Sequence, residues 1–451
     1  MKRWQKYTLI GAGVVAVLLI VAVISFWSMI QVLMGTEGIT GPTEAVPAAV
    51  KGNIPPPVPG ANDWPSWLGP NGDGASTVKG ITTDWSTGLK QEWEVNFLCA
   101  GGSEATWSAP VVKGNRLVVP GRGEGKDLLF CLNPRDGSLI WKAEYAAEAD
   151  SSHGTGPRAT PCIDGDHVYT FGRSGDVSCF QLLDGTGVWR TSVAKEGGEA
   201  PKWGHSSSPI VAGDSVVVQG GGSARVIAFD KKTGKLNWTS GSGPAGYAPV
   251  VPAKTKEQNV LLAFHGKGLD CIDPASGKLL WNQVWETNYD VNATTPVVAG
   301  NQVFITSDYG RGCALFAFDA VKATKVWENT AMAAHHSDPW IIDGHIYGYS
   351  GMSMQNRGDF KCLNLESGEE KWSTREIGHG TCLSVDGHLL CCDIKGNLFL
   401  VKPDPGEFVK VTEKRTALGK VRGPVWTRPV VANGKLYLRF KQKLVCYQLV
   451  P

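Results

Sequence analysis

Two short signatures recur along this chain and constrain its fold more than any other feature. The first is a proline followed by apolar residues and a tight turn that contains glycine in most copies. Its copies begin at Pro110, Pro161, Pro209, Pro249, Pro296, Pro339 and Pro429, and an eighth copy at Cys382 lacks the proline. Gly, Asp-Gly and Asn-Gly tolerate the positive φ angles of tight β-hairpins. The pattern therefore predicts eight hairpins.

The second signature is an acidic or amide residue, a glycine four positions later and a tryptophan four positions after that. It occurs at Asn133/Gly137/Trp141, Gln181/Gly185/Trp189, Asp230/Gly234/Trp238, Asp273/Gly277/Trp281 and Asn364/Gly368/Trp372, and Asp319/Ala323/Trp327 replaces the glycine. The equal offsets predict one turn geometry, with each indole at the junction between neighbouring units. Burial of such a ring stabilises the fold by about 2–3 kcal/mol per unit.

The spacing of these tryptophans predicts a closed ring. Successive ones lie 43 to 49 residues apart, which is enough for four short strands, or one propeller blade. The last unit stops before its Gly/Trp signature, and the missing piece is found at the front, where Trp93 precedes Trp141 by 48 residues. We therefore expect an all-β, eight-bladed β-propeller that is closed by its N-terminal strand. The unit around 382–410 has no tryptophan and is the expected weak joint.

The cysteines fit the same alignment. There are 11 of them, an odd number, and five occupy one equivalent strand position of their units: Cys131, Cys179, Cys271, Cys362 and Cys446. Two other units have alanine at this position, Ala228 and Ala317. A position that alternates between Cys and Ala is small and buried, so we expect structural thiols there. The alternative is a disulfide framework with one spare thiol in an oxidising compartment.

The N-terminal part has a different composition. Residues 1–7 form a basic tail, and residues 8–35 contain no charge and are long enough to cross a membrane as one helix. Residues 36–62 form a Pro/Gly-rich linker, and residues 63–451 form the propeller. We interpret 8–35 as an uncleaved signal anchor, with a removed signal peptide as the alternative. The net charge of +2 offers no sign of a basic face for nucleic acid.

The repeat resembles that of pyrroloquinoline-quinone-like (PQQ-like) β-propellers, whose motif is Ala-x-Asp-x-x-Thr-Gly-x-x-x-Trp. Residues 228–238 match it best, and the resemblance covers about 64–451. The opening stretch 63–74 is similar to the lead-in of membrane-anchored or secreted propellers of planctomycete-like bacteria. This resemblance implies a bacterial cell envelope, and the basic tail before the apolar run favours a single-pass anchor in the cytoplasmic membrane with the N-terminus inside and the propeller in the periplasm.

Two groups within this family imply different functions. Quinoprotein dehydrogenases of alcohols or sugars bind PQQ and Ca²⁺, whereas BamB is a cofactor-free scaffold of the outer-membrane β-barrel assembly machinery. This chain lacks the haem motif Cys-x-x-Cys-His, and no catalytic Asp or Ca²⁺ ligand transfers by motif. BamB is a lipoprotein, whereas this chain has a predicted spanning anchor. We expect a non-enzymatic scaffold for cell-envelope proteins without a cofactor; the alternatives are a PQQ-dependent dehydrogenase and a small-ligand binder at the channel mouth.

The residues just before the proline column should line the mouth of the channel, where propellers usually bind ligands. The candidates are Trp107, Arg158, His205, His335, His336, His379, Trp426 and Arg428. Arginine and histidine suit an anionic or quinone-like ligand stacked on tryptophan. No column of carboxylates accompanies them, so we expect no metal. Some quinoprotein dehydrogenases join adjacent cysteines in the funnel, but Cys391 and Cys392 lie in a strand-like run that points them to opposite faces.

Overall fold

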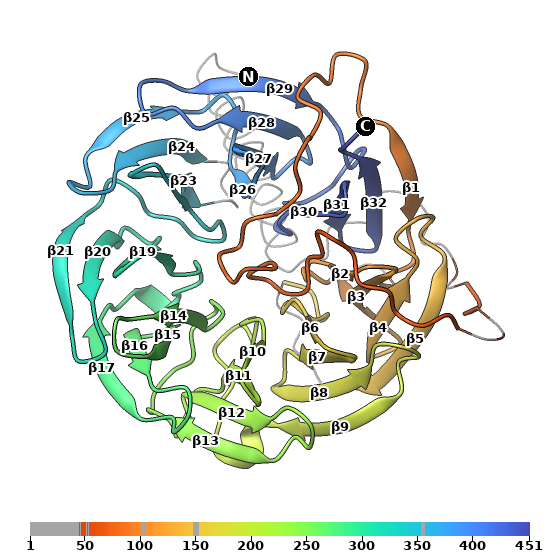
Figure 1. The fold of residues 1–451 in the computed structure, drawn as a ribbon, viewed down its shortest axis with the longest axis horizontal. Helices are drawn as coiled ribbons and strands as arrows, with labels where there is room; N and C mark the ends of the chain where they lie inside the picture. The colour runs from red at the N-terminus through yellow and green to blue at the C-terminus, as the bar shows by residue number, and fades with distance from the viewer. Residues whose placement is uncertain are drawn as a thin grey trace, which may run out of the picture.

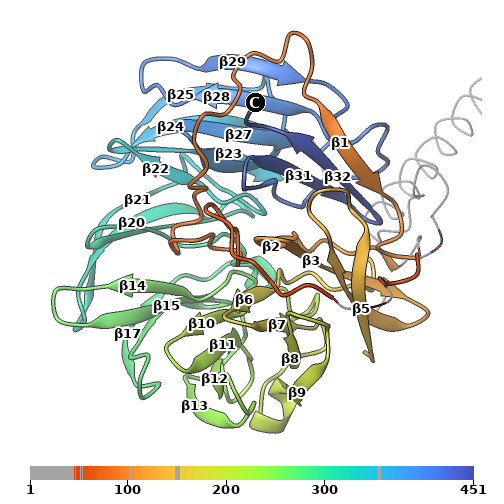
Figure 2. The same cartoon turned by 45° about the vertical axis from the view of Figure 1, so that its right-hand side comes forward.

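The computed structural model is an eight-bladed β-propeller, which confirms the predicted fold class (Figure 1). It describes residues 45, 47–50, 52, 54–100, 104–147, 153–352 and 357–451. Each blade is a sheet of four antiparallel strands; in blades 1 to 7 the first strand lies at the central channel and the fourth at the rim, and in blade 8 the rim strand is β1. Figure 2 shows the same blades turned by 45° about the vertical axis. No helix in the described part of the chain is long and apolar enough to cross a membrane, and the predicted anchor at 8–35 lies outside it.

Blades 1 to 4 follow one another along the chain. Blade 1 contains β2 (Val111–Lys113), β3 (Arg116–Gly123), β4 (Lys126–Leu132) and β5 (Leu139–Ala146). Blade 2 contains β6 (Cys162–Asp164), β7 (His167–Phe171), β8 (Asp176–Gln181) and β9 (Gly187–Ser192), followed by the 3₁₀ turn η2 (Val193–Glu196). Blade 3 contains β10 (Ile210–Ala212), β11 (Ser215–Gln219), β12 (Val226–Asp230) and β13 (Leu236–Ser240). Blade 4 contains β14 (Val251–Lys254), β15 (Asn259–His265), β16 (Gly268–Ile272) and β17 (Leu279–Val284), followed by η3 (Asn288–Asp290).

Blades 5 to 8 complete the ring. Blade 5 contains β18 (Val297–Ala299), β19 (Gln302–Ser307), β20 (Gly312–Phe318) and β21 (Ala323–Asn329). Blade 6 contains β22 (Trp340–Ile342), β23 (His345–Met352), β24 (Arg357–Asn364) and β25 (Glu370–Thr374). Blade 7 contains β26 (Gly380–Val385), β27 (His388–Asp393), β28 (Leu398–Lys402) and β29 (Val409–Lys414). Blade 8 contains β30 (Val430–Ala432), β31 (Lys435–Phe440), β32 (Lys443–Gln448) and, from the other end of the chain, β1 (Gln91–Val95).

The closure of the ring is as predicted. Strand β1 pairs with β32, so the first strand of the chain forms the rim of the last blade. Trp93 lies opposite Cys446 in this ladder, and its ring is 6.0 Å from that of Tyr437. Antiparallel pairing of the two ends removes the open edges that an unclosed sheet would expose.

The recurrent tryptophans lie at the junctions between blades, also as predicted. Seven indoles each donate a hydrogen bond of 2.8–3.1 Å to a backbone carbonyl of the next blade. The donors are Trp93, Trp141, Trp189, Trp238, Trp281, Trp327 and Trp372. The signature glycines adopt positive φ and leave room for the indole: a Cβ on Gly234 would lie 2.6 Å from the Trp189 ring. Burial of the ring and the inter-blade hydrogen bond therefore act at the same place.

Blade 7 lacks this tryptophan, and the junction with blade 8 is bridged differently. Thr412 occupies the corresponding ladder position, opposite Leu400. The lead-in segment (residues 54–90) passes over this junction, and its buried Trp85 donates a backbone hydrogen bond to the Thr412 hydroxyl. Nearby, Thr82 N–H donates to the carbonyl of Leu449 in blade 8. Figure 1 shows this part of the chain in orange, between β26–β29 and β30–β32. The lead-in thus supplies a link that the repeat itself lacks.

The earlier half of the lead-in crosses the channel. Trp64 forms two backbone hydrogen bonds with Val112 of blade 1, and Ile163 N–H of blade 2 donates to the Pro65 carbonyl. Farther along, Ser76 N–H donates to the Ser384 carbonyl of blade 7. The chain therefore runs from one side of the ring to the other through its centre (Figure 1).

All eleven cysteines are free and buried. The five repeat-aligned ones lie in strand interiors, as expected for small apolar residues. Burial raises the pKa of the Cys271 thiol to about 12, which keeps it protonated at neutral pH. Cys391 and Cys392 are successive residues of β27 and point to opposite faces of the sheet, as the alternation predicts.

Candidate functional site

A cavity of about 480 Å³ lies at the centre of the ring, on the face where the loops between blades converge. Its aromatic lining consists of Trp67, Trp107, Trp203, Trp426, Tyr247, Tyr309, His153, His335 and His336. The remaining lining residues are Arg158, Ser206, Ser208, Pro249, Val291, Ala293 and Asp338. The cavity is thus mostly aromatic, with few charged groups.

Seven aromatic side chains contact one another in a closed circle, which we call the aromatic collar. In order around the circle they are Trp203, His153, Trp426, His336, His335, Tyr309 and Tyr289. Consecutive ring centroids are 3.8–6.4 Å apart, and the closest pair is the stack of His335 on His336. Six members line the cavity, whereas Tyr289 is 59% exposed and therefore lies at the rim. Aromatic pairs at these separations each contribute about 0.5–1.5 kcal/mol beyond their burial.

Two histidines of the collar, His335 and His336, are neutral at physiological pH. Burial lowers the pKa of His335 to about 4 and that of His336 well below its ordinary value, and neighbouring histidines lower both further. The charged groups of the lining are then Arg158, whose guanidinium donates to the Trp203 carbonyl at 2.7 Å, and Asp338. A neutral imidazole can donate through one nitrogen and accept through the other. A ligand in the cavity would therefore meet aromatic ring faces and neutral hydrogen-bonding groups more often than charged groups.

The floor of the cavity is Trp67 of the lead-in segment. Its indole N–H donates to the Thr295 hydroxyl at 3.0 Å. Both carboxylate oxygens of Asp338 accept hydrogen bonds from Thr295, from its backbone N–H at 2.7 Å and its hydroxyl at 2.8 Å. The Arg428 guanidinium stacks 4.2 Å from the Trp67 ring and pairs with Asp338 at 3.3 Å. This network fixes the lead-in across the channel and closes the cavity from below.

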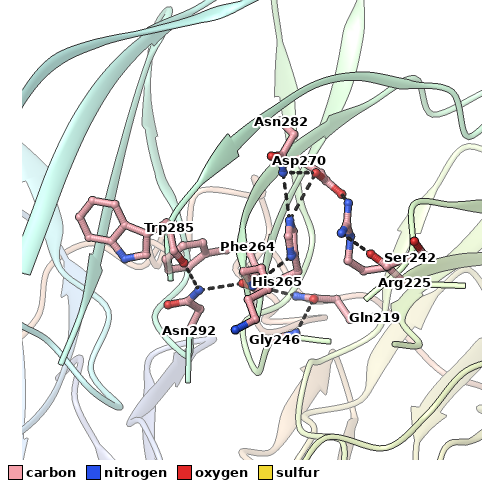
Figure 3. A network of polar contacts seen from close by, with 11 residues as sticks. Gln219, Arg225, Ser242, Gly246, Phe264, His265, Asp270, Asn282, Trp285 and Asn292 are labelled. Atoms are coloured by element: carbon pink, nitrogen blue, oxygen red, sulfur yellow. Dashed lines mark hydrogen bonds and ion pairs between the residues drawn. The ribbon is translucent and has the colours of Figure 1, made fainter. Parts of the chain in front are cut away.

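One wall of the cavity is held by buried amides (Figure 3). The side chain of Gln219 accepts from Gly246 N–H at 2.8 Å and donates to the Ala248 carbonyl at 2.7 Å, which fixes the loop that carries Tyr247. The Asn292 side chain donates to the His265 carbonyl at 2.7 Å. These bonds satisfy buried backbone groups and position the loops around the mouth.

Beside these amides lies a buried ionic cluster, also drawn in Figure 3. Asp270 of blade 4 pairs with Arg225 of blade 3, lies 3.3 Å from His265 and accepts from Asn282 at 2.7 Å. Burial alone would raise the pKa of Asp270, but these partners lower it overall. The cluster joins two blades and lies outside the cavity lining, so it supports the wall.

Five of the eight residues predicted for the site line the cavity: Trp107, Arg158, His335, His336 and Trp426. The other three do not. His205 packs 4.7 Å from the Phe171 ring and is 1% exposed. His379 donates through Nε2 to the Gly351 carbonyl at 2.8 Å, in the unit that has no column proline. Arg428 lies beneath the floor.

The sequence reasoning missed several lining residues. Trp203 and Tyr247 come from loops between blades, and Tyr309 comes from the loop between β19 and β20 within blade 5; these loops differ in length from unit to unit and cannot be aligned. Trp67 belongs to the lead-in, outside the repeat. The pair of tryptophans at 64 and 67, too far forward to belong to any blade, was the one available signal.

The described residues offer little to hold a metal ion. No group of three or more His, Cys, Asp or Glu residues in the described part of the chain is arranged to hold one. Among the described residues Asp338 is the sole carboxylate in the lining, and both of its oxygens are already hydrogen-bonded. Ca²⁺ takes six to eight oxygen ligands, so this lining does not fit the pairing of PQQ with Ca²⁺.

Comparison with known proteins agrees with this architecture. Residues 125–374, more than half of the chain, match the family described as outer membrane protein assembly factor BamB. The chain belongs to this family. Among solved structures, BamB from Moraxella catarrhalis is similar with a TM-score of 0.56 and 16% identity, over 76% of this chain and 94% of that one. No curated protein matches the sequence.

Two dehydrogenases share the fold as well. The quinohemoprotein alcohol dehydrogenase from Comamonas testosteroni has a TM-score of 0.62 and 12% identity, over 85% of this chain and 80% of that one. The quinohemoprotein alcohol dehydrogenase ADHIIG from Pseudomonas putida has a TM-score of 0.58 and 14% identity, over 88% of this chain and 83% of that one. At these identities the likeness establishes the PQQ-like propeller fold, which scaffold and enzyme share.

Proposed function

We propose that this protein is a non-catalytic scaffold that holds other proteins of the bacterial cell envelope. In this proposal residues 8–35 anchor it in the cytoplasmic membrane and the propeller lies in the periplasm. The membership of the BamB family supports the proposal, as does the fold shared along 94% of a BamB chain.

The hydrogen bonds and the ion pair of Asp338 are the observation that favours a scaffold over a dehydrogenase. Asp338 is the sole carboxylate that the described residues contribute to the lining, and it is already bonded to Thr295 and Arg428. An oxidation of an alcohol needs a base within hydrogen-bonding reach of the substrate hydroxyl. A carboxylate that is already committed to the floor of the cavity is poorly placed for that task.

Photo-crosslinking can test the scaffold. Val284 and Val321 are 72% and 76% exposed and sit on opposite faces: Val284 ends β17 beside the loops of the cavity, and Val321 lies in the turn between β20 and β21. A photoreactive amino acid is placed at one site or the other in the full-length chain, and the cells are irradiated. We expect one of the two sites to crosslink reproducibly to one partner and the other site to give no such product. Equal, diffuse products from both faces would contradict a specific scaffold.

The dehydrogenase alternative is tested directly with the cofactor. The purified chain is titrated with PQQ, with and without Ca²⁺, and thermal unfolding is followed. We expect no saturable shift. A saturable, Ca²⁺-dependent rise in Tm would overturn the scaffold in favour of the enzyme.

A second function, the binding of a small ligand, is favoured by one observation beside the cavity, where the lining residue His335 meets Asp308 behind it. His335 Nδ1 and Asp308 Oδ2 are both buried, lie 3.7 Å apart and have no hydrogen-bond partner among the described residues. Burial raises the pKa of Asp308 and lowers that of His335. Buried polar atoms without partners are costly, and a ligand hydroxyl or amide between these two would satisfy both.

Tryptophan fluorescence reports on such a ligand, because Trp67, Trp107, Trp203 and Trp426 line the cavity. A metabolite library screened against the wild-type chain and His335→Phe should give saturable quenching by a compound that the variant binds at least tenfold more weakly. Equal binding by both chains would place the ligand elsewhere.

A further inference from the structure

Two cysteines face each other across the inner hairpin of blade 7. Cys382 of β26 and Cys391 of β27 are Cα partners in the ladder. Among the ladders of the described strands this is the one cysteine–cysteine pair. Elsewhere cysteines face residues that cannot bridge to them, as Cys131 faces Val118 and Trp141.

The register of the hairpin sets the distance between the two residues. Asp386 and Gly387 both have positive φ, of 49° and 72°, and form a two-residue turn closed by the pair Val385 and His388. The closing pair of such a turn is hydrogen-bonded, and hydrogen-bonded and non-hydrogen-bonded pairs alternate along an antiparallel ladder.

Counting back from that turn makes Cys382 and Cys391 a non-hydrogen-bonded pair. The Cα atoms of such pairs lie about 4.5 Å apart and their side chains share one face. Disulfides span Cα separations of about 4.4–6.8 Å, so this pair falls at the short end of the permitted range.

The surroundings isolate the pair from water and from other thiol partners. Both residues are 0% exposed. The Cys382 thiol donates a weak hydrogen bond to the Asp338 carbonyl at 3.7 Å. The Tyr349 hydroxyl is buried beside the Cys391 thiol. Burial raises the pKa of the Cys391 thiol well above its ordinary value, and the neighbouring Cys382 thiol raises it further.

We propose that Cys382 and Cys391 form a reversible cross-strand disulfide when the protein meets a disulfide oxidant. One thiol loses its proton and attacks a sulfur of oxidised glutathione, whose S–S bond breaks and releases one glutathione thiolate. The second thiol then loses its proton and attacks the mixed disulfide, which releases the second glutathione. The protein loses two protons and two electrons, and oxidised glutathione takes up both to become two glutathione thiols.

The position of the bond gives it a role. It would link β26 to β27 in blade 7, the blade that has no inter-blade tryptophan. Because the Cys382 thiol contacts the carbonyl of Asp338, the bond would lie directly behind the floor of the cavity. A pair at the short end of the distance range is strained when oxidised, and strained disulfides are reduced more easily than relaxed ones. Because the buried thiols are rarely ionised, the exchange is slow in the folded state. That the compartment is oxidising rests on the proposed function, whereas the chemistry of the pair does not.

The test uses the purified, reduced full-length chain. One sample is incubated folded with oxidised glutathione, and a second is unfolded in urea and refolded in a glutathione redox buffer. Free thiols are then alkylated under denaturing conditions and the peptides are identified by mass spectrometry. We expect a 382–391 crosslink with a mass loss of about 2 Da, reversed by dithiothreitol.

Cys392 supplies the matched control, because it is adjacent, equally buried and faces Thr381. Cys392→Ser should keep the crosslink, whereas Cys382→Ser and Cys391→Ser should lose it. Alkylation of residues 382 and 391 in both samples to the extent seen for the other cysteines would overturn the proposal. A dominant crosslink between other cysteines would do the same. Neither result bears on whether the propeller is a scaffold.

Discussion

The backbone N–H of Trp85 donates to the hydroxyl of Thr412 at 3.3 Å, and Thr412 stands where the other seven blades carry a tryptophan. A residue outside the repeat thus reaches the one junction at which the repeat is incomplete. The indole of Trp85 is 4% exposed and belongs to the core cluster that spans blades 7 and 8. The expected weak joint is accordingly covered by the lead-in segment.

Removal of this indole should therefore weaken the closure of the ring. We expect Trp85→Ala to lower the free energy of unfolding by about 3–5 kcal/mol, as for other buried tryptophans. Urea unfolding followed by circular dichroism measures the loss. Thr83→Ala, two positions away and exposed, is the control and should change stability by less than about 0.5 kcal/mol. Equal effects of the two changes would mean that the lead-in does not support the ring.

The signature glycine can be tested within blade 3 by two matched substitutions. Gly234 and Gly213 both have positive φ, of 69° and 59°. A Cβ on Gly234 would meet the Trp189 ring at 2.6 Å, whereas a Cβ on Gly213 would meet nothing within 4 Å. Gly213→Ala should cost about 1 kcal/mol of backbone strain, and Gly234→Ala should cost about 1–3 kcal/mol more. Denaturant unfolding of both variants gives the difference, and equal losses would show that the inter-blade contact does not constrain this position.

The fold was readable from sequence because its determinants are local and repeated. Each blade needs a turn glycine, a capping tryptophan and short apolar strands, and these recur at fixed offsets, as at Gly137 and Trp141. The ring closure followed from the same count. The site could be predicted only in part. In most units the residue three positions before the proline lines the cavity. This rule fails at His379, where the proline is absent and β26 begins at the next residue.

The remaining parts of the site depend on contacts between distant segments. Trp67 reaches the cavity because the lead-in crosses the channel and bonds to Thr295, and neither residue predicts the other. Tyr289 reaches the collar through two successive left-handed residues, with φ of 62° at Tyr289 and 60° at Asp290. This conformation is tolerated by aspartate but is unfavourable for tyrosine, so the sequence does not signal it at Tyr289.

The buried histidine His205 should make stability depend on pH. Burial lowers its pKa to about 4 from 6.5. Above pH 6.5 it is neutral in both the folded and the unfolded chain and has no effect. Between pH 6.5 and 4 the unfolded chain binds the proton more tightly, so stability falls as the pH falls, by roughly 3 kcal/mol in total.

His205→Phe removes this titration and keeps a ring against Phe171. Urea midpoints from pH 7.5 to pH 4.5 should therefore fall less steeply for the variant than for the wild-type chain. Parallel curves would indicate that His205 does not titrate between these limits, or that water reaches it.

The pairing of Arg428 with Asp338 beneath the cavity provides the last prediction. Arg428 is 4% exposed and Asp338 8%, so each charge is compensated mainly by the other and by Thr295. Asp338→Asn should lower the free energy of unfolding by about 3–5 kcal/mol, because it leaves a buried guanidinium without a counter-charge. The double variant Asp338→Asn with Arg428→Met should recover part of that loss, since no unpaired charge remains. Unfolding of the wild-type, two single and double variants completes the cycle. Additive losses would show that the two side chains are not coupled, and that the cavity floor depends on Trp67 and Thr295 alone.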